Sequence, residues 1–323
     1  MKVLFVAQYA PHREKKIPIH VQSQMDSLIK NNIDVIPYPF HQNGIFDKIK
    51  SYIKLKRFLK SNRFDIIHCH FSYIGLAGLL ASKEKNVIVS FMGTDLENIL
   101  TDQSQFTVKI SNLLTKYLIN RSNSLKGIIV KNQKHYKFLS SKVKCPIINL
   151  PNGVDIDKFY PIDINIARKK IGYNINKPLV IFCTAKNNNP IKNIDLANKS
   201  IDILKEKINV EFKVLSQLNH DQLLLYYNSA DVLLLTSLSE GSPNVIKEAM
   251  ACNLPIVATN VGDISERIKD DENSHVANFD SIEIAECIYK VILTNQRSKG
   301  REILINDKID NTSIANKLIE FYN

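Results

Sequence analysis

The 323-residue sequence lacks any long apolar run. No segment approaches the roughly 18 consecutive apolar residues that a membrane-spanning helix needs. The opening residues, MKVLFVAQYAP, also lack the layout of a signal peptide. We therefore expect a chain that neither spans a membrane nor carries an export signal.

Paired cysteines and glycine-rich nucleotide motifs are also missing. The five cysteines are widely spaced and form no C-x-x-C pair, which argues against a disulfide or zinc framework and favours reduced thiols in a cytosolic protein. Neither G-x-G-x-x-G nor G-x-x-x-x-G-K-[ST] occurs. These absences argue against a dehydrogenase and a P-loop enzyme.

Acidic residues are scarce in the first half of the chain. Residues 1–150 carry 23 Lys and Arg against 9 Asp and Glu, whereas residues 151–323 carry 20 against 23. The densest basic stretch, 48–63, is mixed with apolar residues and predicts an amphipathic helix for an anionic membrane surface. A solvated surface helix would show the same pattern. We expect no nucleic-acid partner, because no nucleic-acid-binding motif accompanies the charge.

Short β-branched and apolar runs alternate with helical periodicity along the whole chain. The predicted strands are Val3–Ala7, Asp34–Pro37, Ile66–His70, Val87–Phe91, Gly127–Lys131 and Ile147–Leu150, then Leu179–Thr184, Glu211–Leu215, Val232–Thr236, Ile256–Thr259 and His275–Asn278. Helical spacing is seen at Val21, Met25, Leu28 and Ile29. This alternation is typical of an α/β protein with doubly wound parallel sheets.

The boundary between the two series lies near the turn signal Pro151-Asn-Gly-Val-Asp155. We predict one Rossmann-like domain at 1–152 and a second at 153–305. A terminal helix at 306–323, with apolar residues Ile314, Leu318, Ile319 and Tyr322, could pack on either. Two such domains would face a central cleft at the carboxyl ends of their strands.

The most informative segment follows the apolar strand VLLLT and runs from Glu240 to Glu248 as EGSPNVIKE. We predict Ser242 as a helix N-cap and Pro243 as the first helical residue. The amides around Pro243, Asn244 and Val245 would then be placed to bind a phosphate. The two glutamates alone would count as ordinary residues, Glu240 as a loop charge and Glu248 as a solvated helix residue. Gly-Ser-Pro between them at a strand-to-helix turn favours a binding element instead.

The segment resembles the E-x7-E motif of retaining GT-B glycosyltransferases of family four, the group 1 type. Asn228-Ser-Ala-Asp231 resembles the N-x-x-D that precedes this motif, and Cys252-Asn-Leu-Pro-Ile-Val-Ala-Thr259 resembles the G-x-P-V-V-A-T that follows it. Pro151-Asn-Gly-Val-Asp155 resembles the interdomain P-N-G-V-D. The resemblance implies a GT-B fold and retaining, metal-independent transfer of a sugar from a nucleotide diphosphate donor.

The resemblance also implies roles for residues of the second domain. Glu240 would contact the donor hexose and Glu248 the nucleotide ribose, with Gly241 in the same donor-binding element. Lys192 matches the lysine that neutralises the diphosphate leaving group, where fixed positive charge stabilises the transition state. The companion arginine of the family is missing, and Lys186 is either its substitute or an ordinary loop lysine.

The first domain departs further from the family pattern. Asp65-Ile-Ile-His-Cys-His70 resembles D-V-V-H-x-H and places His70 on the acceptor side. His68 and His70 share one strand face, but no third ligand stands out and we expect no metal. Met92 stands where the family has a histidine before Gly-Thr-Asp95, so either Asp95 and a backbone carbonyl serve there or activity is reduced. Ile17-Pro-Ile-His20 replaces a glycine pair, and we place His20 on the acceptor side too.

These features predict a cytoplasmic hexosyltransferase, peripheral at the inner face of the membrane, that acts in surface polysaccharide, capsule or glycolipid synthesis. Its catalytic residues would be Glu240, Lys192 and Asp95. It would use a nucleotide-sugar co-substrate, no other cofactor, and a saccharide or lipid-linked acceptor. The alternatives are a non-catalytic GT-B partner subunit and a sugar-nucleotide epimerase or hydrolase.

Asp155-Ile-Asp157 is a chance D-x-D, because it lies at the interdomain turn.

Overall fold

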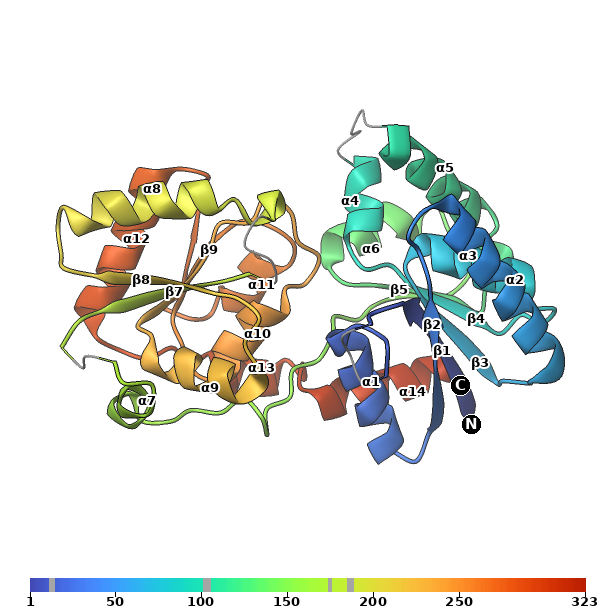
Figure 1. Cartoon of the computed structure of the whole chain (residues 1–323), viewed down its shortest axis with the longest axis horizontal. Coiled ribbons are helices and arrows are strands. Elements are labelled where there is room, and N and C mark those ends of the chain that lie inside the picture. Colours follow the sequence, from blue (N-terminus) through green and yellow to red (C-terminus); the bar gives the residue numbers. More distant parts are fainter. Residues whose placement is uncertain (12–14, 101–105, 174–175, 185–188) are drawn as a thin grey trace. The chain divides into compact units, whose positions relative to one another are not determined.

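Eleven short strands, all paired in parallel, organise the described part of the chain. A computed structural model describes the chain except residues 12–14, 101–105, 174–175 and 185–188. The strands form a six-stranded sheet and a five-stranded sheet, in two compact units (Figure 1). Unit 1 comprises Met1–Asn152 and Asn311–Asn323, and unit 2 comprises Gly153–Asp310. The predicted α/β class with two doubly wound parallel sheets is confirmed.

Unit 1 is built on the sheet order β2-β1-β3-β4-β5-β6. Its strands are β1 (Lys2–Gln8), β2 (Asp34–Phe40), β3 (Ile66–His70), β4 (Val87–Ser90), β5 (Gly127–Val130) and β6 (Ile147–Asn149). Its helices are α1 (Ile19–Lys30), α2 (Ile45–Ser61), α3 (Ser72–Ala81), α4 (Thr94–Leu100), α5 (Phe106–Asn120), α6 (Gln133–Ser140) and α14 (Asn311–Tyr322), with a 3-10 turn η1 (Ser122–Ser124).

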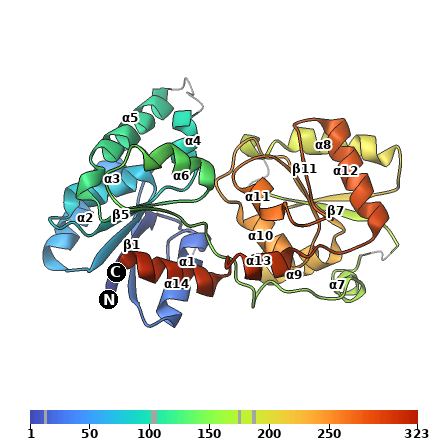
Figure 2. The same ribbon diagram turned by 180° about the vertical axis from the view of Figure 1, so that it is seen from behind.

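The apolar strands of unit 1 bury both faces, as the continuous runs in the sequence predict. In β1, Leu4 and Val6 pack in the cluster under α2, α3 and α5, whereas Val3 and Phe5 pack under α1 and α14. The second view shows α1 and α14 lying together, apart from α2, α3 and α5 (Figure 2). Side-chain alternation along each strand therefore supplies two separate cores.

The terminal helix α14 packs on unit 1. Ile314, Leu318 and Tyr322 are buried with α1, while Ile319 is partly buried at the edge of the same cluster. The Tyr322 hydroxyl lies 2.6 Å from Nδ1 of His68 in β3. Tyr322, 254 residues after His68 in the sequence, thus completes the core of the first sheet.

On α1, the predicted buried face is correct for three residues and wrong for one. Val21, Met25 and Leu28 are buried, whereas Ile29 is 45% exposed. Ile29 follows Leu28 by one residue, which rotates its side chain by about 100° around the helix and away from the core.

Unit 2 is built on the sheet order β11-β10-β9-β7-β8. Its strands are β7 (Leu179–Cys183), β8 (Glu211–Leu215), β9 (Val232–Leu235), β10 (Ile256–Thr259) and β11 (His275–Ala277). Its helices are α7 (Ile164–Lys170), α8 (Ile194–Lys205), α9 (His220–Ser229), α10 (Asn244–Ala251), α11 (Ile264–Ile268), α12 (Ser281–Thr294) and α13 (Gly300–Asn306), with a 3-10 turn η2 (Pro190–Lys192).

Two arginines satisfy backbone carbonyls inside unit 2. Arg297 donates to the carbonyl oxygens of Ala230, Tyr227 and Cys252 at 2.6–3.1 Å. Arg301 donates to three further carbonyls, including that of Phe159 at 2.8 Å. Buried carbonyls without partners would be costly, so these side chains hold the ends of α9 and α10 in place.

Among the described residues, no helix is both long and apolar enough to cross a membrane.

The contact between Tyr322 and His68 should contribute measurably to stability. We expect Tyr322→Phe to lower the free energy of unfolding by about 1–3 kcal/mol, because it leaves a buried ring nitrogen without its partner. Urea titration followed by circular dichroism measures the change. Tyr117→Phe is the control: Tyr117 is 46% exposed, and its hydroxyl loss should cost at most about 0.5 kcal/mol. Equal stability of the two variants would contradict this role for Tyr322.

Candidate active site

The predicted donor-binding residues lie where two neighbouring parallel strands end. β7 pairs with β9 through Val180 opposite Val232 and Ile181 opposite Leu233. Both strands therefore end at the same edge of the sheet. The turn η2 follows β7 and carries Lys192, and the segment after β9 carries Glu240.

Backbone contacts hold these two segments side by side. The amide of Leu238 donates to the carbonyl of Ile191 at 2.8 Å. The Thr236 hydroxyl donates to the carbonyls of Lys192 and Asn193 at 3.1 and 2.9 Å. Since these bonds fix the main chain on both sides, the side chains of Lys192 and Glu240 start from adjacent positions.

Lys192 and Glu240 form an ion pair. The Lys192 Nζ lies 2.6 Å from Glu240 Oε1, and each side chain is 17% exposed. The Ser237 hydroxyl donates to the same Oε1 at 2.9 Å. Two residues that the sequence assigned to the diphosphate and to the donor sugar are thus in direct contact, while their roles stay predictions.

The start of α10 differs from the sequence prediction. The helix begins at Asn244, with Pro243 as its N-cap in extended conformation. Ser242 does not cap it, since its hydroxyl donates to Asp263 Oδ2 at 2.8 Å. Predicting Ser242 as N-cap and Pro243 as the first helical residue was wrong. The amides of Asn244 and Val245 still lie in the first turn, where N–H groups have no intrahelical acceptor.

A buried lysine of α10 contacts the segment that precedes this helix. Lys247 is 1% exposed and donates to the Ser242 hydroxyl oxygen at 3.1 Å. Burial lowers the pKa of Lys247 to about 8, against the opposing charge of Asp263. Asp263 in turn accepts from Arg267 Nε at 2.9 Å. This network fixes Ser242 and the chain on either side of it.

Glu248 is oriented by a buried tyrosine. The Tyr227 hydroxyl donates to Glu248 Oε2 at 2.9 Å, and Tyr227 itself is fully buried. Burial raises the pKa of Glu248, while the hydrogen bond from Tyr227 acts in the opposite direction. Burial also raises the pKa of the Cys183 thiol to about 12, with smaller effects from Tyr227, Glu248 and Lys192. The Tyr227 hydroxyl also lies 3.9 Å from the Cys183 sulfur, so it links Glu248 to the end of β7.

Sequence reasoning missed Tyr227 and Asp263. Tyr227 directly precedes the N-x-x-D motif, whose own residues serve the fold. Asn228 Oδ1 accepts from the amide of Ile162 at 2.7 Å. Asp231 pairs with Arg168 at 2.6 Å. The motif marks the position of α9 in the sequence. Only the hydrogen bond between α9 and α10 in the structure shows that Tyr227 reaches Glu248.

In unit 1, the histidines of β3 form a buried stack. The rings of His68 and His70 lie 4.4 Å apart. His68 bonds to Tyr322 through Nδ1 and to the Ser90 hydroxyl through Nε2 at 2.7 Å. Burial, and secondarily the charge of Lys131, holds the pKa of His68 well below its usual range. His68 therefore serves the core as a neutral ring.

His70 has a different environment. It is 2% exposed, and neither of its ring nitrogens has a hydrogen-bond partner among the residues that the structure describes. Burial lowers its pKa strongly, with further contributions from His68, Lys131 and His20. Both predicted acceptor-side histidines, His20 and His70, belong to unit 1.

Asp95 is enclosed by backbone amides. Its carboxylate accepts from the amides of Ser72, Met92 and Gly93 at 3.0–3.2 Å, and it is 6% exposed. Burial raises its pKa to about 6, although these hydrogen bonds act in the opposite direction. The carboxylate holds the turn after β4 against the start of α3, and its catalytic role stays a prediction.

The structure says little about two further predictions, the role of Lys186 and the lack of a metal site. Lys186 lies outside the described residues. Among the residues that the structure describes, no group of three or more His, Cys, Asp or Glu side chains could hold a metal ion.

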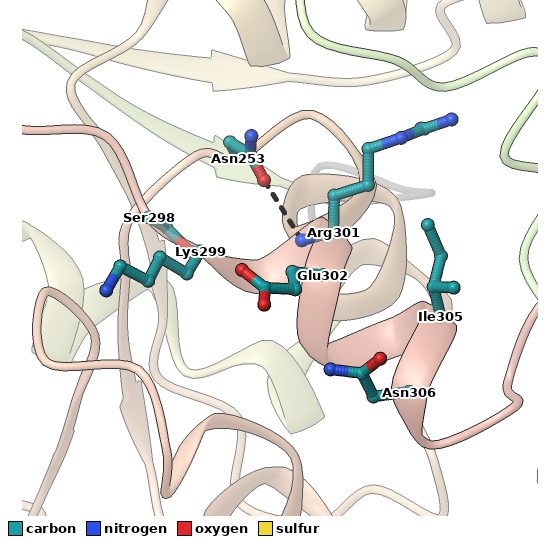
Figure 3. A pocket seen from close by; sticks show the side chains of 7 residues that line it. All are labelled: Asn253, Ser298, Lys299, Arg301, Glu302, Ile305 and Asn306. Atoms are coloured by element: carbon teal, nitrogen blue, oxygen red, sulfur yellow. Dashed lines mark hydrogen bonds between the residues drawn. The ribbon is translucent and has the colours of Figure 1, made fainter.

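A cavity of about 360 Å³ lies on α13, and none of the predicted site residues that the structure describes lines it (Figure 3). Its lining residues are Asn253, Ser298, Lys299, Arg301, Glu302, Ile305 and Asn306. Asn253 accepts from the amide of Arg301 at 3.0 Å, drawn as a dashed line. The Arg301 guanidinium is directed to backbone carbonyls instead, so this hollow belongs to the packing of α13.

Both halves of the chain match known family models. Residues 3–158 match Glycosyltransferase Family 4, and residues 195–308 match Glycosyl transferases group 1. The chain belongs to the group 1 glycosyltransferases. The recognition made from E-x7-E and its neighbouring motifs is confirmed.

Curated relatives agree with this assignment. An uncharacterized glycosyltransferase of Methanocaldococcus jannaschii is 27% identical over 86% of this chain and 84% of its own. The UDP-Gal:alpha-D-GlcNAc-diphosphoundecaprenol alpha-1,3-galactosyltransferase of Escherichia coli is 25% identical over 74% and 69%. Group 1 membership and the relatives together establish glycosyltransferase activity for this chain at the level of the family.

Solved structures establish the GT-B fold. Sucrose-phosphate synthase from Thermosynechococcus elongatus aligns with a TM-score of 0.80 at 15% identity, covering 100% of this chain and 98% of that one. Anabaena HepE in complex with UDP-glucose aligns with a TM-score of 0.75 at 17% identity, covering 99% and 98%. At this identity the likeness concerns the fold alone.

The turn that carries Glu240 depends on a glycine. Gly262 has φ +63°, and a Cβ there would lie 2.7 Å from the carbonyl oxygen of Gly241 and 3.0 Å from that of Glu240. We expect Gly262→Ala to displace this turn and to reduce transferase activity at least about tenfold. The left-handed backbone should also cost about 1–2 kcal/mol of stability.

Gly172→Ala is the matched control. Gly172 has φ +66°, but no atom of the described residues lies within 4 Å of its added Cβ. Both variants should lose stability through the left-handed backbone, Gly262→Ala more because its Cβ also meets backbone oxygens, and only Gly262→Ala should lose activity. Equal activities in the two variants would show that the close approach of Gly262 to Glu240 does not position the site.

Proposed function

We propose that this glycosyltransferase moves a hexose from a nucleoside diphosphate donor, with retention of anomeric configuration and without a required metal. The acceptor is a saccharide or a lipid-linked sugar in the synthesis of a surface polysaccharide, a capsule or a glycolipid. The observation that carries the proposal is the contact of Lys192 with Glu240 after β7 and β9, together with Glu248 held by Tyr227, whose hydroxyl also contacts Cys183 at the end of β7.

The donor would bind to unit 2. The diphosphate would lie against Lys192 and the first-turn amides of α10, because a cation and free N–H groups both favour an anion. Glu248, held by Tyr227, would accept hydrogen bonds from the ribose hydroxyls. Glu240 would accept hydrogen bonds from the donor hexose.

The chemistry follows from the charge that develops on the leaving group. As the bond between the anomeric carbon and the phosphate oxygen breaks, negative charge grows on the diphosphate, and the Lys192 ammonium stabilises it. The acceptor hydroxyl attacks from the same face as the leaving group. The departing phosphate takes the hydroxyl proton, so the reaction requires no strong protein base.

Relatives support the substrate class. The Escherichia coli galactosyltransferase is named for a UDP-sugar donor and a diphosphoundecaprenol-linked acceptor. HepE was crystallised with UDP-glucose. We therefore take uridine nucleotides as the first donors to test, with a lipid-linked sugar as the first acceptor.

A donor screen tests the proposal. The protein is melted with UDP, GDP, ADP and CMP, alongside Glu248→Ala and Lys192→Ala. We expect one diphosphate to raise the melting temperature and Glu248→Ala to abolish the rise. Lys192→Ala should reduce turnover by about 100-fold, more than it weakens binding, because its charge matters most in the transition state. Glu211→Ala, at the start of β8 and thus at the opposite end of the sheet, is the control.

Three outcomes would redirect the assignment. Unchanged turnover in both site variants would refute the proposed site. Absence of a thermal shift with all four nucleotides would favour the non-catalytic partner subunit, which Met92 in place of the family histidine also favours. Hydrolysis of the donor without acceptor would favour the epimerase or hydrolase alternative.

We further propose that unit 1 binds an anionic membrane surface. On α2, Phe46, Ile49 and Ile53 are 77%, 50% and 42% exposed and lie on the face opposite the buried Leu55. The exposed cations Lys50, Lys54 and Lys56 lie on either side of this apolar stripe, and Arg57 and Lys60 lie beyond it toward the C-terminal end of α2. An apolar stripe bordered by cations fits the boundary between lipid headgroups and acyl chains.

Helix α5 adds a second exposed apolar face. Ile110, Leu113, Leu114 and Tyr117 are exposed at helical spacing, with Lys109 and Lys116 beside them. Both views and the packing of α3 against each neighbour place α3 between α2 and α5, in the same layer on the first sheet (Figures 1 and 2). Two such helices in one layer enlarge the surface available to lipid.

Vesicle sedimentation tests this surface. We expect Phe46→Ser/Ile49→Ser to weaken binding to phosphatidylglycerol-containing vesicles at least about tenfold, since each buried apolar side chain contributes about 1.5–3 kcal/mol. Ile282→Ser/Leu293→Ser, on equally exposed residues of α12, is the control. Binding that is indifferent to lipid charge, or equally reduced in both variants, would contradict the proposal.

A further inference from the structure

The Lys192–Glu240 ion pair affects which ligands the site prefers. The ammonium that would neutralise the donor diphosphate is already paired, at 2.6 Å, with a carboxylate of the same unit. Both side chains are mostly shielded from water, with 17% exposure each. Any anion that binds Lys192 must therefore compete with Glu240.

The pair is preformed by its surroundings. Thr236 and the Leu238 amide fix the backbone on both sides of Lys192. The Ser237 hydroxyl, which itself belongs to the Glu240 segment, holds Glu240 Oε1. The two charges consequently cannot separate by movement of the main chain without breaking these bonds, and competition takes place between side chain and ligand.

A nucleotide sugar and a free nucleoside diphosphate differ in what they offer Glu240. When a diphosphate takes Lys192, the carboxylate loses its cation and faces additional negative charge. A hexose attached to the diphosphate brings hydroxyl groups that donate to the carboxylate and compensate for this loss. A diphosphate without the sugar leaves the carboxylate uncompensated.

We infer that Glu240 is a specificity-determining residue that weakens binding of the free nucleoside diphosphate relative to the nucleotide sugar by competing for Lys192. The inference rests on the proposed donor site. After transfer, the hexose leaves Glu240, and the carboxylate re-forms its pair with Lys192 as the diphosphate departs. Glu240 thus favours substrate over product at the same site.

Isothermal titration calorimetry tests the inference with defined probes. UDP, GDP and ADP, and UDP-glucose, GDP-glucose and ADP-glucose, are titrated into the full-length protein, Glu240→Gln, Lys192→Ala and the double variant. We expect Glu240→Gln to bind the recognised diphosphate about tenfold more tightly, while the matching nucleotide sugar binds equally or less tightly. The tightening should be absent in the Lys192→Ala background.

Two further variants control for charge and folding. Glu211→Gln removes one negative charge at the amino end of β8, where Glu211 faces Lys177 at 4.0 Å, and should leave both affinities unchanged. Glu240→Asp keeps the charge but shortens the side chain by one methylene, and should show a smaller tightening than Glu240→Gln. Thermal unfolding of each variant identifies loss of fold.

The outcomes separate the inference from the proposed function. If Lys192→Ala weakens diphosphate binding but Glu240→Gln does not tighten it, the donor site stands and the inference fails. If the tightening persists without Lys192, Glu240 acts by general repulsion and the inference also fails. If the unaltered protein binds none of the six probes, the proposed donor site itself is wrong.

Discussion

Parallel pairing of β7 with β9 is the constraint on which the donor-side site depends. Because both strands run in the same direction, their carboxyl ends meet at one edge, and η2 and the Glu240 segment must leave the sheet there. Hydrogen bonds from Thr236 and Leu238 then fix the spacing of the two segments. The contact between Lys192 and Glu240, 48 residues apart in sequence, follows from this arrangement.

Much of the fold could be predicted from the sequence, because buried parallel strands require nearly continuous apolar runs. The run Val232–Leu235 is an example: it is fully buried and its ends lie within one residue of the prediction. The ends of helices were harder to predict from the sequence. Ser242 looks like an N-cap locally, but Asp263, 21 residues later, takes its hydroxyl. Long-range partners of this kind leave no local signal.

The site was predictable only in part for the same reason. Glu240, Glu248 and Lys192 belong to local motifs, through which the resemblance to family four points to them. Tyr227 of α9 orients Glu248, and Asp263, at the start of α11, accepts from Ser242 within the same segment. Their importance arises from tertiary contacts, which a single sequence does not show. Asp95 is the opposite case. Its motif is visible in the sequence, but only the structure shows that its carboxylate accepts hydrogen bonds from three backbone amides.

The return of α14 to unit 1 bears on the order in which the chain can fold. Unit 2 is continuous in sequence, whereas unit 1 needs residues on both sides of it. During synthesis, all of unit 2 is made before the helix that supplies Ile314, Leu318 and Tyr322 to the first sheet. Domains fold as units while the chain emerges, so unit 2 can reach its final state while the buried His68 still lacks its Tyr322 partner. Completion of the second unit would thus precede closure of the first.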